Sequence, residues 1–216
     1  MNGRFITFEG TEGCGKSTQL RLLAERWTTA GRDVVCTREP GGTEIGRALR
    51  GLLLRPTDQP MAAETELLLY TADRAQHLTQ VIQPALARGA LVLCDRYLDA
   101  TVAYQGYGRG LSVETIERLH ELPPLDRRPD RTLWIDIDPA EGLQRARSRD
   151  AQDGCAAAEG RFEAETLAFH RRVHDGYRAL ARREPRRIHV VDGHDSIETV
   201  HARVCAAIDD LLEVPS

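Results

Sequence analysis

The sequence predicts an α/β fold in which helices cover both faces of a parallel β-sheet. Five short apolar runs that read as strands alternate along the chain with segments whose apolar residues recur at helical spacing. Such alternation builds parallel sheets with helices on both sides. A glycine-rich phosphate-binding pattern also lies between the first strand and the first helical segment. Because ligands of these sheets bind at the carboxyl ends of the strands, we expect the functional residues there.

The first strand candidate, residues 4–9, leads directly into the phosphate-binding pattern G-x-x-x-x-G-K-[ST]. The glycines of this pattern let backbone N–H groups turn inward around a phosphate, at the positive end of the helix that opens with Ser17 and Thr18. The pattern predicts nucleotide binding, with Lys16 on the β- and γ-phosphates and Ser17 on Mg²⁺. The full match consists of Gly10, Thr11, Glu12, Gly13, Cys14, Gly15, Lys16 and Ser17.

Lys16 is the only lysine among the 29 lysine and arginine residues of the chain. A sequence that uses arginine everywhere else but keeps lysine here indicates a need for a compact ammonium on a flexible stem. Guanine-specific switches use an N-K-x-D or T-K-x-D element, which a chain with one lysine in its phosphate loop does not contain. A GTPase-like regulator is therefore the weaker alternative.

The other strand candidates, residues 33–37, 90–95, 132–137 and 187–192, bring charged residues to the same edge of the sheet. The first strand ends at Glu9, the second runs into Arg38, and the third ends at Asp95 and Arg96. Because the carboxyl ends of parallel strands share one edge, we expect these clusters to converge.

Asp95 closes an apolar run, which is the pattern of a Walker B strand whose aspartate holds Mg²⁺ directly or through water. Asp136 competes for this role, and we favour Asp95. Asp138 is followed by Pro139 and reads better as a helix N-cap. Arg96 can fork two hydrogen bonds onto a phosphate, although a neighbouring aspartate and arginine are more often an ordinary ion pair.

The segment 64–77 reads as a helix that presents Tyr70 and Arg74, four residues apart, on one face. An aromatic ring and an arginine on one face can stack on a base and hydrogen-bond to it. Alone, such a pair is more often part of the core edge and the surface. We assign no special role to His77.

The length, charge and cysteine content of the chain limit the class of protein it can belong to. With 216 residues and a net charge of −4, the chain reads as a single domain, 1–216, without the polybasic surface of a nucleic-acid-binding protein. No apolar run approaches the roughly 20 residues that cross a bilayer, and the N-terminus reads as a strand rather than a signal peptide. Five cysteines without a C-x-x-C pair fit a reducing compartment, with Cys36 and Cys94 as core residues. We expect a cytoplasmic protein without membrane or nucleic-acid partners.

The stretch from Ser148 to Gly160 breaks a helical pattern that resumes at Arg161. It reads as a flexible lid insertion at about 148–163, and a plain surface loop is the alternative.

Besides the phosphate loop with its acidic Glu12, five longer motifs occur in order along the chain. They are Phe8-Glu9-Gly10, Thr37-Arg38-Glu39-Pro40-Gly41-Gly42, Tyr70-Thr71-Ala72-Asp73-Arg74-Ala75-Gln76-His77, Asp95-Arg96-Tyr97 and Ala103-Tyr104-Gln105-Gly106. Together they resemble bacterial thymidylate kinase, and the resemblance spans almost the whole chain. The second motif, and the fourth and fifth taken together, are far more discriminating than the phosphate loop.

This resemblance implies transfer of the γ-phosphoryl group of ATP to dTMP, giving dTDP and ADP, with Mg²⁺. It also implies a P-loop nucleoside monophosphate kinase fold with a five-stranded parallel sheet and a closing lid, and a homodimer. The alternative is a kinase of the same fold with another acceptor, such as a deoxynucleoside or a different monophosphate. A nucleoside needs no phosphate clamp, so Arg38 and Arg96 count against that acceptor.

On matching positions, the resemblance implies that Arg38 and Arg96 hold the 5′-phosphate of dTMP. It places Glu12 near the sugar and the transferring group. Tyr104 would lie against the sugar, where its ring excludes a 2′-hydroxyl.

The resemblance also implies a base site. Tyr70 would stack on thymine and Arg74 would bond to the base oxygen O4. Thr101 and Gln105 would border the base.

The phosphate loop carries no arginine, so the chain resembles the bacterial type that delivers an arginine from its lid. Candidates are Arg147, Arg149 and Arg161, and the sequence leaves open which of them acts. Arg149 also matches the position that packs on adenine. Gly160 departs from the aspartate usual before the lid arginine.

Overall fold

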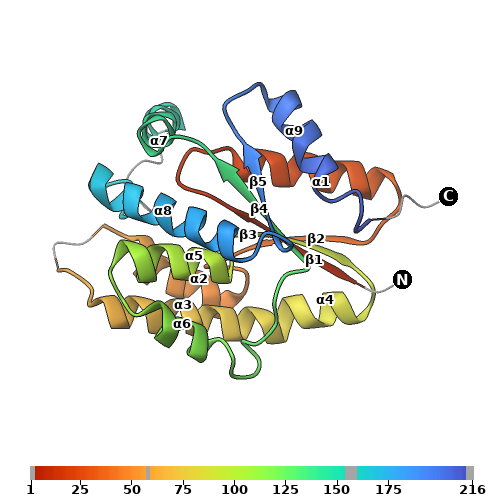
Figure 1. Cartoon of the computed structure of the whole chain (residues 1–216). Helices are drawn as coiled ribbons and strands as arrows, with labels where there is room; N and C mark the ends of the chain where they lie inside the picture. The colour runs from red at the N-terminus through yellow and green to blue at the C-terminus, as the bar shows by residue number, and fades with distance from the viewer. Residues whose placement is uncertain (1–2, 57–58, 154–159, 213–216) are drawn as a thin grey trace.

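A five-stranded parallel sheet forms the centre of the protein, with helices on both faces (Figure 1). The computed structural model describes residues 3–56, 59–153 and 160–212. The strand order is β2-β3-β1-β4-β5, and all neighbours are parallel. The five predicted strands are confirmed to within one residue at each end, as β1 (Arg4–Glu9), β2 (Val34–Arg38), β3 (Leu91–Asp95), β4 (Arg131–Asp136) and β5 (Ile188–Asp192).

Helical segments connect the strands. On one face of the sheet lie α1 (Lys16–Thr29) and α9 (Ile197–Ala206), and most of the others lie on the opposite face (Figure 1). The remaining segments are α2 (Glu44–Leu54), α3 (Ala63–His77), η1 (Leu78–Ile82), α4 (Gln83–Ala87), α5 (Leu98–Thr101), η2 (Val102–Gly108), α6 (Val113–Leu119), α7 (Pro139–Asp153) and α8 (Leu167–Arg183), where η marks a π-helical turn.

Alternate residues of the strands build two separate hydrophobic cores. Phe5 and Trp134 belong to the core beneath α3, η2 and α8, whereas Ile6 and Leu133 belong to the core beneath α1 and α9. Both faces of the central strands are buried, which explains why their sequences are nearly continuous apolar runs.

The register brings the predicted residues to one edge of the sheet. Phe8 and Arg38 each pair with Asp95, so the carboxyl ends of β1, β2 and β3 lie side by side. The strand order reverses around β1, and the crevice at such a switch point is where open α/β sheets bind ligands.

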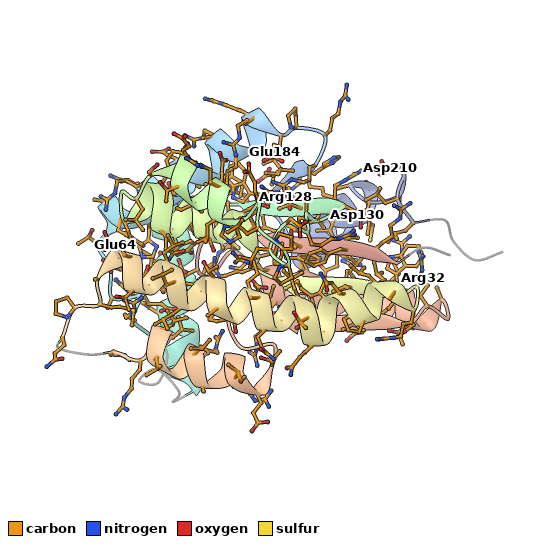
Figure 2. The ribbon with its side chains drawn as sticks, turned by 90° about the horizontal axis from the view of Figure 1, so that it is seen from below. Arg32, Glu64, Arg128, Asp130, Glu184 and Asp210 are labelled. Atoms are coloured by element: carbon orange, nitrogen blue, oxygen red, sulfur yellow. The ribbon has the colours of Figure 1, made fainter. Side chains whose placement is uncertain are left out.

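Acidic and basic side chains are interspersed in the view of Figure 2, where Glu64 at the start of α3, Arg128 and Asp130 before β4, and Asp210 near the C-terminus are labelled. In the part of the chain that the structure describes, no helix is long and apolar enough to cross a membrane.

Two helix boundaries predicted next to the lid were wrong. Helix α7 continues through Ser148 to Asp153, because the arginine, alanine and aspartate that follow are compatible with a helix. The helical pattern does not resume at Arg161. Residues 160–165 form a turn, and α8 begins at Leu167 because the Thr166 hydroxyl accepts a hydrogen bond from the N–H of Phe169 and caps it. Residues 154–159 of the predicted lid lie outside the described residues.

The expectation for Cys36 was also wrong. β2 is an edge strand, and Cys36 is exposed on it, whereas Cys94 in the central strand β3 is buried as predicted. The predicted N-cap at Asp138 is confirmed, since its Oδ1 accepts a hydrogen bond of 2.8 Å from the N–H of Ala140.

Candidate active site at the strand ends

The phosphate loop turns from β1 into α1 through three glycines with positive φ. Gly10, Gly13 and Gly15 have φ of 139°, 68° and 94°, a region that residues with a Cβ rarely occupy. The buried Lys16 folds back over the loop, and its Nζ donates to the carbonyl oxygens of Gly10 at 3.1 Å and Thr11 at 2.9 Å. The backbone carbonyls of the loop therefore hold the Lys16 ammonium inside the loop.

Ser17 and Asp95 meet at the start of α1. The Ser17 hydroxyl donates to Asp95 Oδ2 at 2.8 Å. The competing Asp136 is engaged elsewhere, because its Oδ1 lies 2.5 Å from His174 Nε2. Asp95, and not Asp136, is therefore the aspartate that contacts Ser17 of the phosphate loop.

Arg96 adopts a backbone conformation that marks functional sites. It has φ of 66°, and no other described residue besides glycine has a positive φ. Its guanidinium donates to Gly10 O at 3.0 Å and to Glu12 Oε1 at 2.9 Å, and lies over the ring of Tyr104 at 4.8 Å. The turn after β3 thus aims Arg96 at the phosphate loop.

Glu12 is the acidic centre of this cluster. Its Oε1 accepts from Arg96 and, at 2.7 Å, from the Tyr104 hydroxyl. Burial alone would raise the pKa of Glu12, but hydrogen bonding from His170 and the charges of Arg96 and Lys16 hold that pKa well below its ordinary value. Glu12 is therefore an ionised acceptor in a nearly water-free position.

Arg38 stands at the end of β2, beside this cluster in the register of the sheet. Its side chain is exposed and makes no hydrogen bond or ion pair with any other residue of the described ranges. The structure thus brings Arg38, Arg96, Glu12 and Lys16 to one edge and leaves Arg38 available to a ligand.

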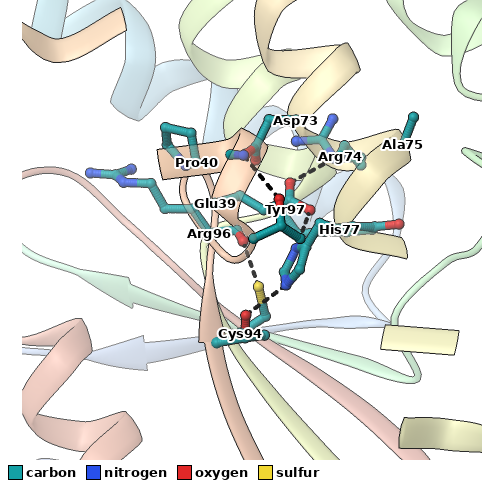
Figure 3. Close-up of polar contacts among 12 residues, drawn as sticks. Glu39, Pro40, Asp73, Arg74, Ala75, His77, Cys94, Arg96 and Tyr97 are labelled. Carbon is teal, nitrogen blue, oxygen red and sulfur yellow. Dashed lines mark hydrogen bonds and ion pairs between the residues drawn. The ribbon is translucent and has the colours of Figure 1, made fainter. Parts of the chain in front are cut away.

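Arg74 is buried in a polar network rather than placed at the surface (Figure 3). Its Nε donates to Glu39 Oε2 at 2.8 Å and its Nη2 to Thr101 Oγ1 at 3.0 Å. Its Nη1 lies 2.6 Å from His120 Nε2. Since arginine only donates, His120 must accept, and burial together with the charge of Arg74 lowers the pKa of His120 to about 3.

Of the other predicted base-site residues, Tyr70 lies on α3, and Thr101 of α5 and Gln105 of η2 contact side chains of α3. Tyr70 is half-buried, and burial followed by the nearby Glu66 raises its pKa. Gln105 is buried, and its Nε2 donates to Glu66 Oε1 at 2.7 Å. Thr101 and Gln105 thus each fix a buried charged side chain of α3, Arg74 and Glu66 respectively.

Sequence reasoning missed the buried partners of these residues, Glu39, Glu66, His77 and His120. His77 accepts or donates at both ring nitrogens, to Thr37 Oγ1 at 2.6 Å and Glu39 Oε1 at 2.9 Å. The motif around Glu39 was noted, but its role as the partner of Arg74 was not. No local pattern marks a buried charge pair, and the sequence signals such partners only indirectly, through charged residues such as Glu66 and Arg74 on a helix that also carries apolar side chains.

The three candidate lid arginines lie in different settings. Arg161 is anchored, because its Nε donates to Leu53 O at 2.6 Å and its Nη2 forms an ion pair with the buried Glu66. Its own N–H donates to Leu54 O, so Arg161 caps the last carbonyls of α2. Arg147 is exposed on α7. Arg149 lies in α7, but its side chain is outside the described atoms.

Comparisons with known proteins agree on one family. Residues 8–204 match the family model described as thymidylate kinase. The chain is 51% identical over 208 residues to a thymidylate kinase of Solidesulfovibrio magneticus, covering 96% of this chain and all of that protein. It is 53% identical over 208 residues to a thymidylate kinase of Gloeobacter violaceus, covering 96% of this chain and 95% of that protein. A crystal structure of thymidylate kinase from Ehrlichia chaffeensis matches with a TM-score of 0.75 and 36% identity, over 97% of this chain and 100% of that one.

Proposed function

The chain belongs to the thymidylate kinase family and transfers the γ-phosphoryl group of ATP to dTMP, and we propose which residues perform each part of this reaction. Phosphoryl transfer depends on positioning and on neutralising charge more than on covalent chemistry by the protein. The observation that carries the proposal is the cluster of Arg96, Glu12 and Tyr104 against the phosphate loop.

On the donor side, the loop from Gly10 to Thr18 binds the phosphates of ATP through its N–H groups. Lys16 exchanges its two carbonyl acceptors for the β- and γ-phosphate oxygens, a step open to a flexible ammonium. Both carbonyls lie in the loop itself, so the ammonium needs only a short movement to reach a bound phosphate.

On the acceptor side, Arg96 and Arg38 bind the 5′-phosphate of dTMP. Arg96 is pre-oriented by Gly10 O and Glu12, whereas the exposed Arg38 contributes from the neighbouring strand. Glu12 accepts from the sugar near the transferring group, and the Tyr104 ring, fixed by its bond to Glu12, leaves no room for a 2′-hydroxyl.

Thymine binds between Tyr70 and the network of Arg74. Arginine has five N–H donors, and Glu39, Thr101 and His120 engage three of them, so two remain for the base oxygen O4. Because buried Glu39 and neutral His120 hold the guanidinium, Arg74 reads the base from a fixed position. Gln105 borders the base from η2.

Mg²⁺ is bound by Ser17 and Asp95 together with the phosphates of ATP. Two oxygen ligands 2.8 Å apart fit a small hard cation that takes most of its ligands from water and phosphate. Among the described residues, no group of three or more His, Cys, Asp or Glu side chains can hold a metal, which agrees with a site completed by substrate. Bound there, Mg²⁺ would neutralise phosphate charge.

The lid region, residues 148–163, supplies an arginine to the transferring phosphoryl group. We assign this role to Arg147 or Arg149 on α7, because Arg161 is held by Glu66 and the end of α2. Arg149 also matches the position that packs on adenine. Arg161 then contributes indirectly, because its contacts with Leu53 and Glu66 fix the turn at residues 160–165. Arg149→Ala is expected to lower kcat with little change in thermal stability, whereas Arg161→Ala is expected to lower both.

The protein acts as a homodimer. Helices α2 and α3 pack together and expose three large apolar side chains, Ile45, Leu52 and Leu68, at 54%, 61% and 59%. A second copy of the chain would cover them. Sedimentation velocity is expected to show a dimer that Leu68→Glu dissociates and the control Leu122→Glu, at a residue 58% exposed elsewhere, does not.

Steady-state kinetics of Arg96→Lys test the acceptor assignment. The lysine keeps the charge but loses the fork that reaches Gly10 O and Glu12 together, so we expect kcat/KM for dTMP to fall about 10²-fold with KM for ATP nearly unchanged. Arg21→Lys on the exposed face of α1, where Arg21 pairs with Glu25, is the matched control and should behave as the parent. An Arg96→Lys enzyme with parental kcat/KM for dTMP would refute the assignment.

A further inference from the structure

Glu9, the last residue of β1, carries a fully buried carboxyl group that neither the donor site nor the acceptor site uses. Its Oε1 accepts a hydrogen bond of 2.8 Å from the N–H of Tyr97, in the turn after β3. Its Oε2 accepts one of 2.8 Å from the hydroxyl of Tyr177, on α8. A single carboxyl group therefore links three segments that are far apart in the sequence.

The bond from Tyr97 lies next to the strained backbone of Arg96. Arg96 has φ of 66°, which a residue with a Cβ occupies only where the surrounding structure holds it. Its own N–H donates to Phe8 O at 2.9 Å, and the N–H of the next residue, Tyr97, donates to the Glu9 side chain. The Arg96 carbonyl oxygen accepts from the Cys94 thiol at 3.1 Å (Figure 3). Phe8 and Glu9, consecutive in β1, therefore hold the peptide groups on the two sides of Arg96.

The bond from Tyr177 reaches the side chain of the same arginine. A tyrosine hydroxyl that gives its one proton to Glu9 keeps lone pairs that can accept. Arg96 Nη1 donates to this hydroxyl oxygen at 3.4 Å. The Tyr177 ring is itself fixed, because it stacks on Trp134 with ring centroids 6.0 Å apart. Glu9 therefore orients the hydroxyl that faces the Arg96 guanidinium.

We propose that Glu9 is a positioning residue of the acceptor site, which holds the turn at Arg96 in its left-handed conformation and orients the guanidinium through Tyr177. This role rests on the proposed function, in which Arg96 binds the phosphate of dTMP.

The two bonds of Glu9 do not depend on its charge. Burial and the nearby Asp99 raise the pKa of Glu9 to about 8. The carbonyl oxygen of a protonated carboxyl group still accepts from the N–H of Tyr97, and the Tyr177 hydroxyl can accept as well as donate. Glu9 therefore acts through the positions of its oxygen atoms, and an uncharged side chain of the same shape should replace it.

Two substitutions of Glu9 separate hydrogen bonding from charge. Glu9→Gln keeps an oxygen for the N–H of Tyr97 and an amide that donates to Tyr177, so kcat/KM for dTMP should stay within about threefold of the parent. Glu9→Leu offers no acceptor, so the turn can relax away from its left-handed conformation. We expect kcat/KM for dTMP to fall about 10²-fold in Glu9→Leu, with KM for ATP nearly unchanged. Parental kcat/KM in Glu9→Leu, or an equal fall in both variants, would overturn the proposal.

Two further variants exclude a general loss of stability. Thr7, two residues before Glu9 on β1, is equally buried, and its hydroxyl lies 2.8 Å from that of Thr132. The control Thr7→Val should lower Tm and keep the parental kcat/KM, and a fall like that of Glu9→Leu would count against the proposal. Tyr177→Phe keeps the stacked ring and removes only the hydroxyl, so it decides the matter if Glu9→Leu does not fold. We expect it to lower kcat/KM for dTMP about tenfold, and parental kinetics would be the contrary result.

Amide hydrogen exchange of the nucleotide-free protein tests the turn without any turnover. The N–H of Tyr97 should exchange about tenfold faster in Glu9→Leu than in the parent or Glu9→Gln, because it has lost its acceptor. Unchanged protection of this N–H in Glu9→Leu would refute the role of Glu9 and leave the acceptor assignment intact. Parental kinetics of Arg96→Lys would instead refute the acceptor assignment, so the two failures are distinguishable.

Discussion

Helix α7 touches the phosphate loop at Gly142, where no side chain fits. A Cβ on Gly142 would lie 2.4 Å from the carbonyl oxygen of Glu12. On the facing side, a Cβ on Gly13, which has φ of 68°, would lie 2.1 Å from Gly142 O. The two backbones are thus in direct contact, and Gly142→Ala forces them apart.

The cost of this substitution follows from the contact distance. Ordinary Cβ contacts begin at 3.4 Å, so the loop or the helix must move by about 1 Å. Overpacking of this kind costs about 1–3 kcal/mol, and the better helix propensity of alanine offsets about 1 kcal/mol. We expect a net loss of up to about 2 kcal/mol, or a decrease of up to about 8 °C in Tm for a chain of this size. Because Glu12 moves with the loop, kcat/KM should fall about 10²-fold.

Thermal unfolding and initial-rate kinetics measure both effects. Gly51→Ala on α2 is the matched control, since a Cβ there meets nothing within 4 Å. It should raise stability by about 0.5–1 kcal/mol and leave the kinetics unchanged. If Gly142→Ala matched Gly51→Ala in both measurements, the reasoning about this contact would be wrong.

Three further predictions follow from buried charges. Lys16→Arg should lower kcat about 10²-fold or more at unchanged Tm, because a planar guanidinium does not replace the ammonium in the loop; near-parental kinetics would contradict this. The folded state holds the pKa of His120 at about 3, below the ordinary 6.5. Between these pH values the unfolded chain binds more protons than the folded one. The free energy of unfolding therefore decreases as pH falls through that window, by about 1.4 kcal/mol per pH unit. His120→Gln keeps an acceptor for Arg74 and should remove this pH dependence, which urea unfolding at pH 7 and 4.5 measures. An equal loss of stability between pH 7 and 4.5 in the parent and in His120→Gln would argue against this role of His120. Glu66→Gln leaves Arg109 and Arg161 without their buried partner and should lower the free energy of unfolding by about 3–5 kcal/mol in thermal unfolding. The control Glu25→Gln, in an exposed ion pair, should lower it by about 0.5 kcal/mol or less. Similar losses in both variants would contradict the role of Glu66.

The sheet and one part of the site could be predicted from the sequence because their signals are local. Apolar runs such as Leu91–Asp95 are buried on both faces, so each is recognisable without its neighbours. Once the strands are parallel, their carboxyl ends must share an edge. The meeting of Ser17 with Asp95 and of Glu12 with Arg96 follows from that rule.

The rest of the site depends on contacts between distant segments. Arg74 and His120 are 46 residues apart, and Glu12 meets His170 through the packing of α8. Neither histidine has a local pattern that distinguishes it from a core residue. The helix boundaries next to the lid were wrong for a related reason, since the end of α7 and the start of α8 depend on helix propensity and on the Thr166 cap rather than on composition.

The account depends most on two proposed sites: the phosphate clamp of Arg38 and Arg96, which demands a monophosphate acceptor, and the base site of Tyr70 and Arg74, which demands thymine. A coupled assay of ADP release that offers dTMP, dUMP, dCMP, dGMP, UMP and thymidine in turn tests this directly. We predict that dTMP reacts best, that dUMP reacts more weakly because it lacks the methyl group, and that thymidine is inert. A clear preference for thymidine over dTMP would contradict the account.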